Sequence, residues 1–196
     1  MTILIATTNA GKLREIRRIL AGLPVELRTL ADCPAAPIAD ETGTTFAENA
    51  RQKALRYSAL TGLQTMAEDS GFEIDALGRE PGVYSARYLS ERATYAERFD
   101  DLQRRLRELG SPDRTARFVC ALAFVRHPEV LFETTASVEG LVAAAPAGIN
   151  GFGYDPIFFY PPYGKTFGEV SDDEKTAVSH RGQAIRAFRR FLIPDP

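Results

Sequence analysis

Apolar residues follow two periods along this chain, one typical of buried strands and one typical of amphipathic helices. The opening stretch TILIAT, residues 2–7, is almost continuously apolar and predicts a buried strand. After a short loop, apolar residues recur at helical spacing among charged ones, at Leu13, Ile16, Ile19 and Leu20. The chain is therefore expected to open as strand, loop and helix.

Capping patterns predict three further helices. In each, a Ser or Thr is followed three residues later by Glu, which is typical of a helix N-terminus. The predicted helices run from Thr45 to Gly62, from Thr94 to Gly110, and from Ser171 through SHRG as far as Leu192.

Short apolar or alternating segments predict the strands. One lies near 25–30, QTMA and FEIDAL at 64–67 and 72–77 form two more, and a hairpin joins 116–127 to 130–143 around Pro128. Glu68 and Asp69 are then expected at a strand end or turn. Helices and strands alternate before the hairpin, so the predicted fold is α/β with a mixed central sheet and flanking helices.

Composition limits the partners of the protein. The 196 residues are 44% hydrophobic with a net charge of −2, which suits one large or two closely joined domains and gives no overall basic field. Generic binding to nucleic acid or to an anionic membrane is therefore not expected, and a small partner is. No charged region precedes the first apolar stretch and no apolar run approaches the ~18 residues of a membrane span, so we expect a cytoplasmic protein.

Lysine is scarce in this chain, which has four lysines against 20 arginines. Where arginine is the usual cation, a remaining lysine can mark a position that needs a compact ammonium group. Lys12, Lys53 and Lys175 are candidates for such positions, although composition alone leaves chance equally open.

The stretch TTNAGK, Thr7 to Lys12, joins the first strand to a helix N-terminus, where backbone N–H groups and the helix dipole favour an anion. It is not a P-loop, because Ala6 and Leu13 stand where that motif needs Gly and Ser or Thr. A phosphate site of another kind is predicted; the alternative is that Asn9 and Gly11 only shape a turn.

Two acidic pairs, Asp40–Glu41 and Glu68–Asp69, could hold magnesium, which commonly takes one or two carboxylates together with substrate phosphates. The alternative is that both pairs are solvated loop residues. SHRG adds a hydroxyl, an imidazole and a guanidinium, and GFGYDP adds aromatic rings that can stack on a base. Together these groups indicate a nucleotide site.

Six motifs in order resemble the inosine triphosphate pyrophosphatase family, whose members hydrolyse non-standard purine nucleoside triphosphates such as dITP and XTP. They are TTNAGK, ETG with FAENA and Lys53, EDSG, PGVYSARY, GFGYDPIF and EKTAVSHRGQA. The resemblance runs from Ile3 to about Phe188. It implies a single pyrophosphatase domain over 1–196, built as two lobes with the nucleotide in the cleft between them, and a homodimer.

The reaction that the resemblance implies splits the α–β phosphoanhydride of the substrate, requires Mg²⁺, and yields the monophosphate and pyrophosphate. Glu41 and Asp69 would bind the metal, and Asp69 would also accept the proton of the attacking water. Phosphates or sugar would be held by Thr7, Thr8, Asn9, Ala10, Gly11, Lys12, Lys53 and Ser70. The base would be surrounded by Phe152, Gly153, Tyr154, Asp155, Lys175, His180 and Arg181.

One departure from the family pattern concerns Glu68, since many members have Asp-Asp-Ser-Gly where this chain has Glu-Asp-Ser-Gly. The extra methylene puts a direct contact of Glu68 with the metal in doubt and leaves Asp69 in place.

Hypoxanthine and xanthine present a hydrogen-bond acceptor at O6, whereas adenine presents a donor. Donors from Arg181 or His180 would therefore favour hypoxanthine and xanthine over adenine. Two alternatives stay open: a related-fold pyrophosphatase for pyrimidine or modified nucleotides, and a nucleotide-binding regulatory module without turnover.

Overall fold

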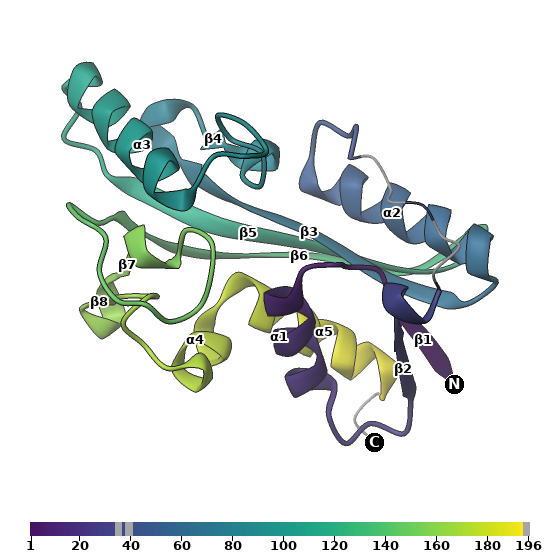
Figure 1. The fold of residues 1–196 in the computed structure, drawn as a ribbon. Helices are drawn as coiled ribbons and strands as arrows, with labels where there is room; N and C mark the ends of the chain where they lie inside the picture. The colour runs from purple at the N-terminus through teal and green to yellow at the C-terminus, as the bar shows by residue number, and fades with distance from the viewer. Residues whose placement is uncertain (34–36, 38–40, 194–196) are drawn as a thin grey trace. The chain divides into compact units, whose positions relative to one another are not determined.

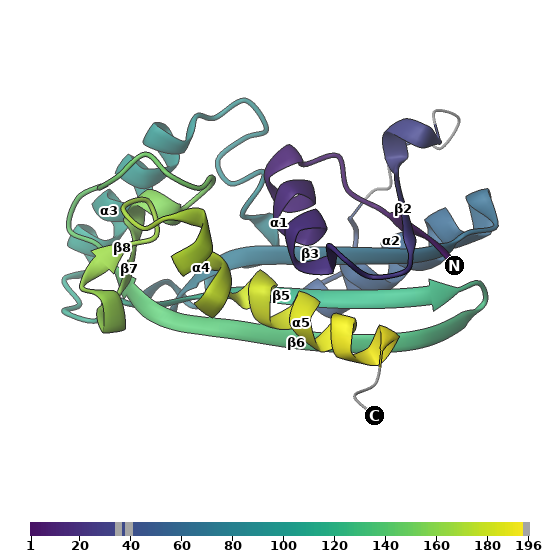
Figure 2. The same ribbon diagram turned by 90° about the horizontal axis from the view of Figure 1, so that it is seen from below.

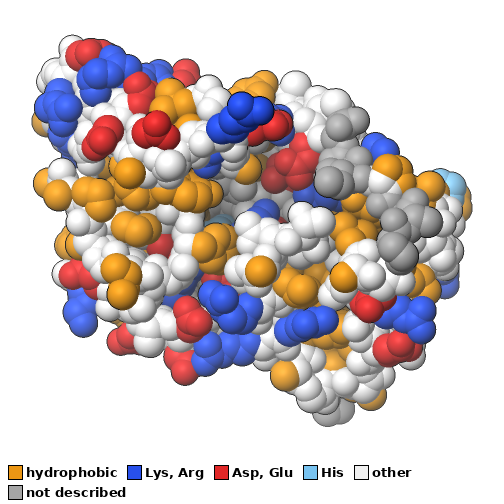
Figure 3. All heavy atoms as spheres, viewed as in Figure 1, with side chains coloured by type: hydrophobic (Ala, Val, Ile, Leu, Met, Phe, Trp, Pro, Cys, Tyr) orange, Lys and Arg blue, Asp and Glu red, His pale blue; other side chains and the backbone are white. Residues whose placement is uncertain are grey.

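The computed structural model describes residues 1–33, 37 and 41–193, and the chain forms two compact units. The first unit comprises residues 1–70, 120–136 and 180–196, and the second comprises 71–119 and 137–179. None of the helices in the described part of the chain is long and apolar enough to cross a membrane. On the face drawn in Figure 3, basic and acidic side chains are interspersed, as the nearly balanced composition leads one to expect.

The strands form one mixed sheet with the order β2-β1-β3-β5-β6-β7-β8, and β4 pairs with β3. Their bounds are β1 Thr2–Ile5, β2 Glu26–Thr29, β3 Gln64–Ile74, β4 Glu80–Pro81, β5 Thr115–Arg126, β6 Glu129–Val142, β7 Phe158–Tyr160 and β8 Lys165–Thr166. β1 is parallel to β2 and to β3, whereas β3–β4, β6–β7 and β7–β8 are antiparallel. The predicted mixed α/β class is therefore confirmed.

Three helices belong to the first unit: α1 Ala10–Leu20, α2 Phe46–Thr61 and α5 His180–Leu192. α1 and α5 lie side by side on one face of the strands of this unit, and α2 covers the other face (Figures 1 and 2). Ile3 and Ile5 of β1, Ile16 of α1 and Phe188 of α5 meet in its apolar core. Burial of this core holds β1 and its two covering helices in place.

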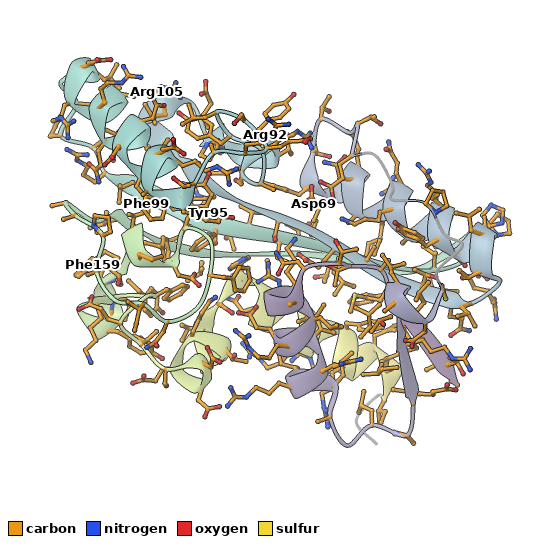
Figure 4. All side chains as sticks on the ribbon, in the orientation of Figure 1. Asp69, Arg92, Tyr95, Phe99, Arg105 and Phe159 are labelled. Atoms are coloured by element: carbon orange, nitrogen blue, oxygen red, sulfur yellow. The ribbon has the colours of Figure 1, made fainter. Side chains whose placement is uncertain are left out.

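The second unit has α3 Tyr95–Leu109 and α4 Asp172–Val178. Its core is rich in aromatic side chains, among them Phe72, Phe99, Phe118 and Phe158. Tyr95 and Phe99 project from neighbouring turns of α3, with ring centroids 6.0 Å apart (Figure 4). Short 3₁₀ helices complete the described chain, at Leu30–Asp32, Asp75–Leu77, Gly82–Tyr84, Asp155–Ile157 and Pro161–Tyr163.

All three predicted capping boxes are confirmed. The hydroxyls of Thr45, Thr94 and Ser171 accept from the backbone N–H three residues later, and each Glu reaches back to the cap. α2 and α3 end at Gly62 and Gly110, both in the left-handed conformation that glycine adopts without strain.

Two predictions about segment boundaries are wrong. Glu68 and Asp69 do not lie at a strand end, because β3 runs unbroken from Gln64 to Ile74 with both acids buried in its middle. Buried partners for the two carboxylates, described below, make this possible. The last predicted helix is two helices, α4 and α5, since Ser179 has extended backbone at φ −64°, ψ 153°, and serine favours helix ends over helix interiors.

Candidate active site

The loop between β1 and α1 is shaped by its own polar side chains. Asn9 caps α1, its Oδ1 accepting from Lys12 N at 3.0 Å, and Thr7 Oγ1 accepts from Asn9 N at 3.2 Å. Thr8, Asn9 and Ala10 are exposed, and Gly11 is half-buried. The segment therefore presents a helix N-terminus to solvent, as the predicted phosphate site requires.

Glu68 is buried among cations. Its Oε1 lies 2.8 Å from Lys12 Nζ and its Oε2 lies 3.6 Å from Arg181 Nε, while the side chain is 1% exposed. Burial raises the pKa of the Glu68 carboxyl, but the charges of Lys12 and Arg181 outweigh it and hold the pKa well below its usual range. Glu68 is therefore ionised in the folded protein.

Glu41 and Lys53 form a second ion pair, with Glu41 Oε1 2.5 Å from Lys53 Nζ. Lys53 lies in α2 and Glu41 in the segment that precedes that helix. Burial lowers the pKa of Lys53, but the charge and hydrogen bond of Glu41, together with the charges of Glu68 and Asp69, outweigh it, so the net shift of the pKa is upward. Lys53 therefore keeps its ammonium charge. Asp40, the other member of the predicted acidic pair, lies outside the described residues.

Asp69 is fixed by an amide from α2. Asn49 Nδ2 donates to Asp69 Oδ2 at 2.9 Å, and Asn49 Oδ1 accepts from Gly43 N at 2.7 Å. A Cβ at Gly43 would lie 2.7 Å from that same Oδ1, so only glycine permits this approach. Asn49 thus ties the segment carrying Glu41 to the carboxylate of Asp69.

Asp69 projects from β3 (Figure 4) and is 5% exposed. Burial, followed by the negative charge of Glu41, raises the pKa of its carboxyl to about 6, against the lowering effect of Lys53, Lys12 and the Asn49 hydrogen bond. A carboxylate with a pKa in this range can accept a proton near neutral pH.

The carboxylates of Glu41 and Asp69 are the groups in the first unit that could hold a magnesium ion. The negative charge of Glu41 raises the pKa of Asp69, and a bound divalent cation would offset this repulsion. Within the described residues no three acidic, His or Cys side chains form a metal cage. Magnesium does not need one, because it commonly takes one or two carboxylates, waters and substrate phosphates.

Arg181 and His180 begin α5 and are buried. The Arg181 guanidinium donates from Nη1 to Glu15 Oε2 and from Nη2 to Ser70 Oγ, both at 2.7 Å. Two of its donor groups are thus engaged within the first unit.

In the second unit, Asp155 joins the GFGYDP loop to α4. Its Oδ2 accepts from Lys175 Nζ at 2.6 Å and from Phe152 N at 2.7 Å, and both Lys175 and Asp155 are at least 97% buried. Lys175 Nζ also lies 4.5 Å from the centroid of the Phe152 ring, a cation–π contact. Asp155, Lys175 and Phe152 therefore form one cluster, and all three are among the residues that the resemblance places around the base.

Tyr154 is part of the apolar core of the second unit. Its ring is 3% exposed and stacks on Phe72 at 5.2 Å, and its hydroxyl donates to Ser85 O at 2.9 Å. Gly153 has φ +67°, a backbone conformation that favours glycine. The buried Tyr154 side chain thus anchors the GFGYDP loop to the core, and the Phe152 ring of the same loop is partly exposed.

The first unit gathers the predicted phosphate and metal residues, and the second gathers the predicted aromatic loop and Lys175. Sequence reasoning did not assign a role to Asn49 or to Glu15. Asn49 could have been found, since it precedes Lys53 by four residues on the same face of α2. Nothing in the sequence distinguishes Glu15 from the other acids of the chain.

Comparison with known proteins identifies the family. The model of the Ham1 family matches residues 3–191. The chain belongs to the Ham1 family. A dITP/XTP pyrophosphatase from Thermus thermophilus is 49% identical over 100% of this chain and 94% of that protein. Another from Exiguobacterium sp. is 44% identical over 99% of this chain and 98% of that protein.

Solved structures of Ham1 proteins agree with the fold. A HAM1 protein from Coxiella burnetii is 38% identical, has a TM-score of 0.93 and covers 100% of both chains. A dITP/XTP pyrophosphatase from Mycobacterium abscessus is 41% identical with a TM-score of 0.76. The predicted family and fold class are therefore confirmed.

Proposed function

We propose that this Ham1 protein hydrolyses non-standard purine nucleoside triphosphates, namely dITP, ITP and XTP, to the monophosphate and pyrophosphate. It would thereby remove these nucleotides from the cellular pool. The names of its relatives support the substrate class. The observation that carries the chemistry is the buried cluster of the first unit, in which Lys12 and Lys53 accompany Asp69, a carboxylate with a raised pKa.

The phosphates would be held by the N-terminus of α1 and by two ammonium groups. Backbone N–H groups of the first turn favour an anion. Lys12 and Lys53 are each paired with a carboxylate, so both side chains are held in place before substrate arrives. In the reaction they would stabilise the negative charge that develops on the leaving pyrophosphate.

Asp69 would act as the proton acceptor. Its pKa of about 6 leaves it ionised at neutral pH yet basic enough to take a proton from the water that attacks the α-phosphorus. Asn49 would orient the carboxylate through Oδ2. Glu41 and Asp69 would hold Mg²⁺, which when bound supplies positive charge that offsets the charge of the phosphate oxygens.

Base recognition remains a prediction. Phe152 would stack on the base, and Lys175 and Asp155 fix its loop. Arg181, His180 or nearby backbone donors would favour the O6 acceptor of hypoxanthine and xanthine, and they would meet the amino group of adenine donor to donor. Such a buried unsatisfied pair costs about 1–3 kcal/mol.

The test is a pyrophosphate-release assay on ITP, dITP, XTP, ATP and a pyrimidine triphosphate, each with and without Mg²⁺. We expect release of pyrophosphate from the first three, dependent on Mg²⁺, and far slower release from ATP. Equal rates on ATP and ITP would contradict the base preference, a preference for the pyrimidine would favour the related-fold alternative, and binding without turnover would favour a regulatory module.

We also propose that the protein is a cytoplasmic homodimer, as the resemblance implies. The cytoplasm is where such an enzyme would meet the nucleotide pool. Light scattering after size-exclusion chromatography measures the mass of the particle, and a mass near that of one 21.6 kDa chain would contradict the dimer.

A further inference from the structure

Glu68 and Asp69 are neighbours in the sequence but face different partners. They are consecutive residues of β3, and consecutive strand residues point to opposite faces of a sheet. Asp69 contacts Asn49 of α2, whereas Glu68 contacts Lys12 of α1 and lies beside Arg181 of α5. α2 covers one face of these strands and α1 with α5 covers the other (Figures 1 and 2).

Both oxygens of Glu68 are committed to groups on that second face. Oε1 lies 2.8 Å from Lys12 Nζ. Oε2 lies 3.6 Å from Arg181 Nε and accepts from Cys120 Sγ at 3.4 Å. Burial and the nearby Glu68 charge raise the pKa of the Cys120 thiol, so it stays protonated and can donate.

From this geometry we infer that Glu68 is a positioning residue: it holds the Lys12 ammonium at the N-terminus of α1 and links it to Arg181, and it does not bind the metal. The inference rests on the proposed function, because the task of Lys12 is to meet phosphate oxygens. A metal ion at Glu68 would have to displace Lys12 from Oε1 and compete with Arg181 and Cys120 for Oε2.

The glutamate side chain suits this role. It is one methylene longer than aspartate, and it contacts elements on either side: α1 through Lys12, and β5 through Cys120. The Lys12 side chain is 17% exposed, so its ammonium can contact a phosphate that enters from solvent. The Glu68 side chain is 1% exposed and pairs with Lys12 from the buried side. Arg181 extends the link to Glu15 and Ser70.

The experiment is a double-mutant cycle with Glu68→Gln and Lys12→Met, read as kcat/KM on ITP at saturating Mg²⁺. We expect Glu68→Gln to lower kcat/KM tenfold or more in the wild-type background and less than threefold in the Lys12→Met background. Equal losses in both backgrounds would overturn the inference. If Glu68→Gln fails to fold, Glu68→Asp replaces it in the same cycle, with an expected loss that again disappears once Lys12 is gone.

The dependence of the rate on Mg²⁺ concentration distinguishes a positioning role of Glu68 from a metal-binding role. The Mg²⁺ concentration for half-maximal rate should stay within twofold of the wild-type value in Glu68→Gln and rise tenfold or more in Glu41→Gln. A rise in Glu68→Gln as large as that in Glu41→Gln would overturn the inference.

Calorimetry with inorganic pyrophosphate and no metal makes the test independent of turnover. Glu68→Gln should weaken pyrophosphate binding, and Lys12→Met should remove that difference. A wild-type protein that binds pyrophosphate in this way but does not hydrolyse ITP would contradict the proposed function alone. Unchanged pyrophosphate binding in Glu68→Gln would contradict the role of Glu68 alone.

Discussion

Asn49 connects the Asp69 carboxylate to the backbone of Gly43, two residues after Glu41, donating from Nδ2 to Asp69 Oδ2 at 2.9 Å and accepting at Oδ1 from Gly43 N at 2.7 Å. It is 1% exposed, so neither bond competes with water. One side chain therefore fixes the proton acceptor and the segment that carries Glu41.

Asn49→Ala should lower kcat on ITP tenfold or more, because Asp69 loses its orienting donor. The same bond lowers the pKa of Asp69, so its loss should move the acid limb of the pH–rate profile to higher pH. Arg56→Ala, an exposed position of α2, is the control and should leave both unchanged. An Asn49→Ala enzyme with an unaltered pH–rate profile would contradict this role.

Asp69→Asn should abolish turnover and yet remove an internal source of instability. The pKa of Asp69 is raised from 3.8 to about 6 on folding, so between these values the folded state holds a proton that the unfolded state has lost. The stability of the wild type should therefore fall as the pH rises from about 4 to about 6, by up to about 3 kcal/mol relative to Asp69→Asn.

Urea unfolding of both proteins across this pH range, with Mg²⁺ removed, measures the difference. The two curves should separate with rising pH and then run parallel above about pH 6. Curves that run parallel throughout would show that the pKa of Asp69 is not raised, and near-normal turnover in a folded Asp69→Asn protein would remove it from the mechanism.

Lys→Arg should not be conservative at positions 12, 53 and 175. Each ammonium is largely buried and paired with a carboxylate, at 2.8, 2.5 and 2.6 Å respectively, and the larger, planar guanidinium group would have to displace the atoms that surround it. We expect kcat/KM on ITP to fall tenfold or more at each position. Lys165 is exposed, and Lys165→Arg is the matched control. Full activity in all four variants would make the scarcity of lysine an accident of composition.

Sequence patterns predicted the elements well where local chemistry determines them. The capping boxes at Thr45, Thr94 and Ser171 placed helix starts, because a cap bonds to the backbone three residues away. Sequence patterns failed where the local structure depends on a residue far away in the sequence. Glu68 and Asp69 looked like turn residues, but partners on other elements, among them Lys12 on α1 and Asn49 on α2, allow them to lie buried in a continuous strand.

In the candidate site, too, the residues that lie in local motifs were predicted and the pairing between distant residues was not. The motif positions Lys12, Lys53, Glu41 and Asp69 do belong to one cluster. The ion pair of Arg181 with Glu15 was not predictable, because it joins residues 166 positions apart and neither has a distinctive local pattern. Side-chain pairing between distant helices depends on the completed fold.

In the second unit, Asp155→Asn should cost about 3–5 kcal/mol of stability, because it leaves the buried ammonium of Lys175 without a counter-charge. Replacing both, as Asp155→Asn with Lys175→Met, should cost less than Asp155→Asn alone, since no buried charge remains. Urea unfolding of Asp155→Asn, Lys175→Met and the double variant gives the comparison. Additive losses in the double variant would show that the two side chains do not act as a pair.

The proposed attack of an Asp69-activated water on the α-phosphorus is tested most directly by hydrolysing ITP in ¹⁸O-labelled water. Mass spectrometry then locates the label in the products. Our account predicts one ¹⁸O atom in inosine monophosphate and none in the pyrophosphate released. Label in the pyrophosphate, or formation of the diphosphate and orthophosphate, would contradict it.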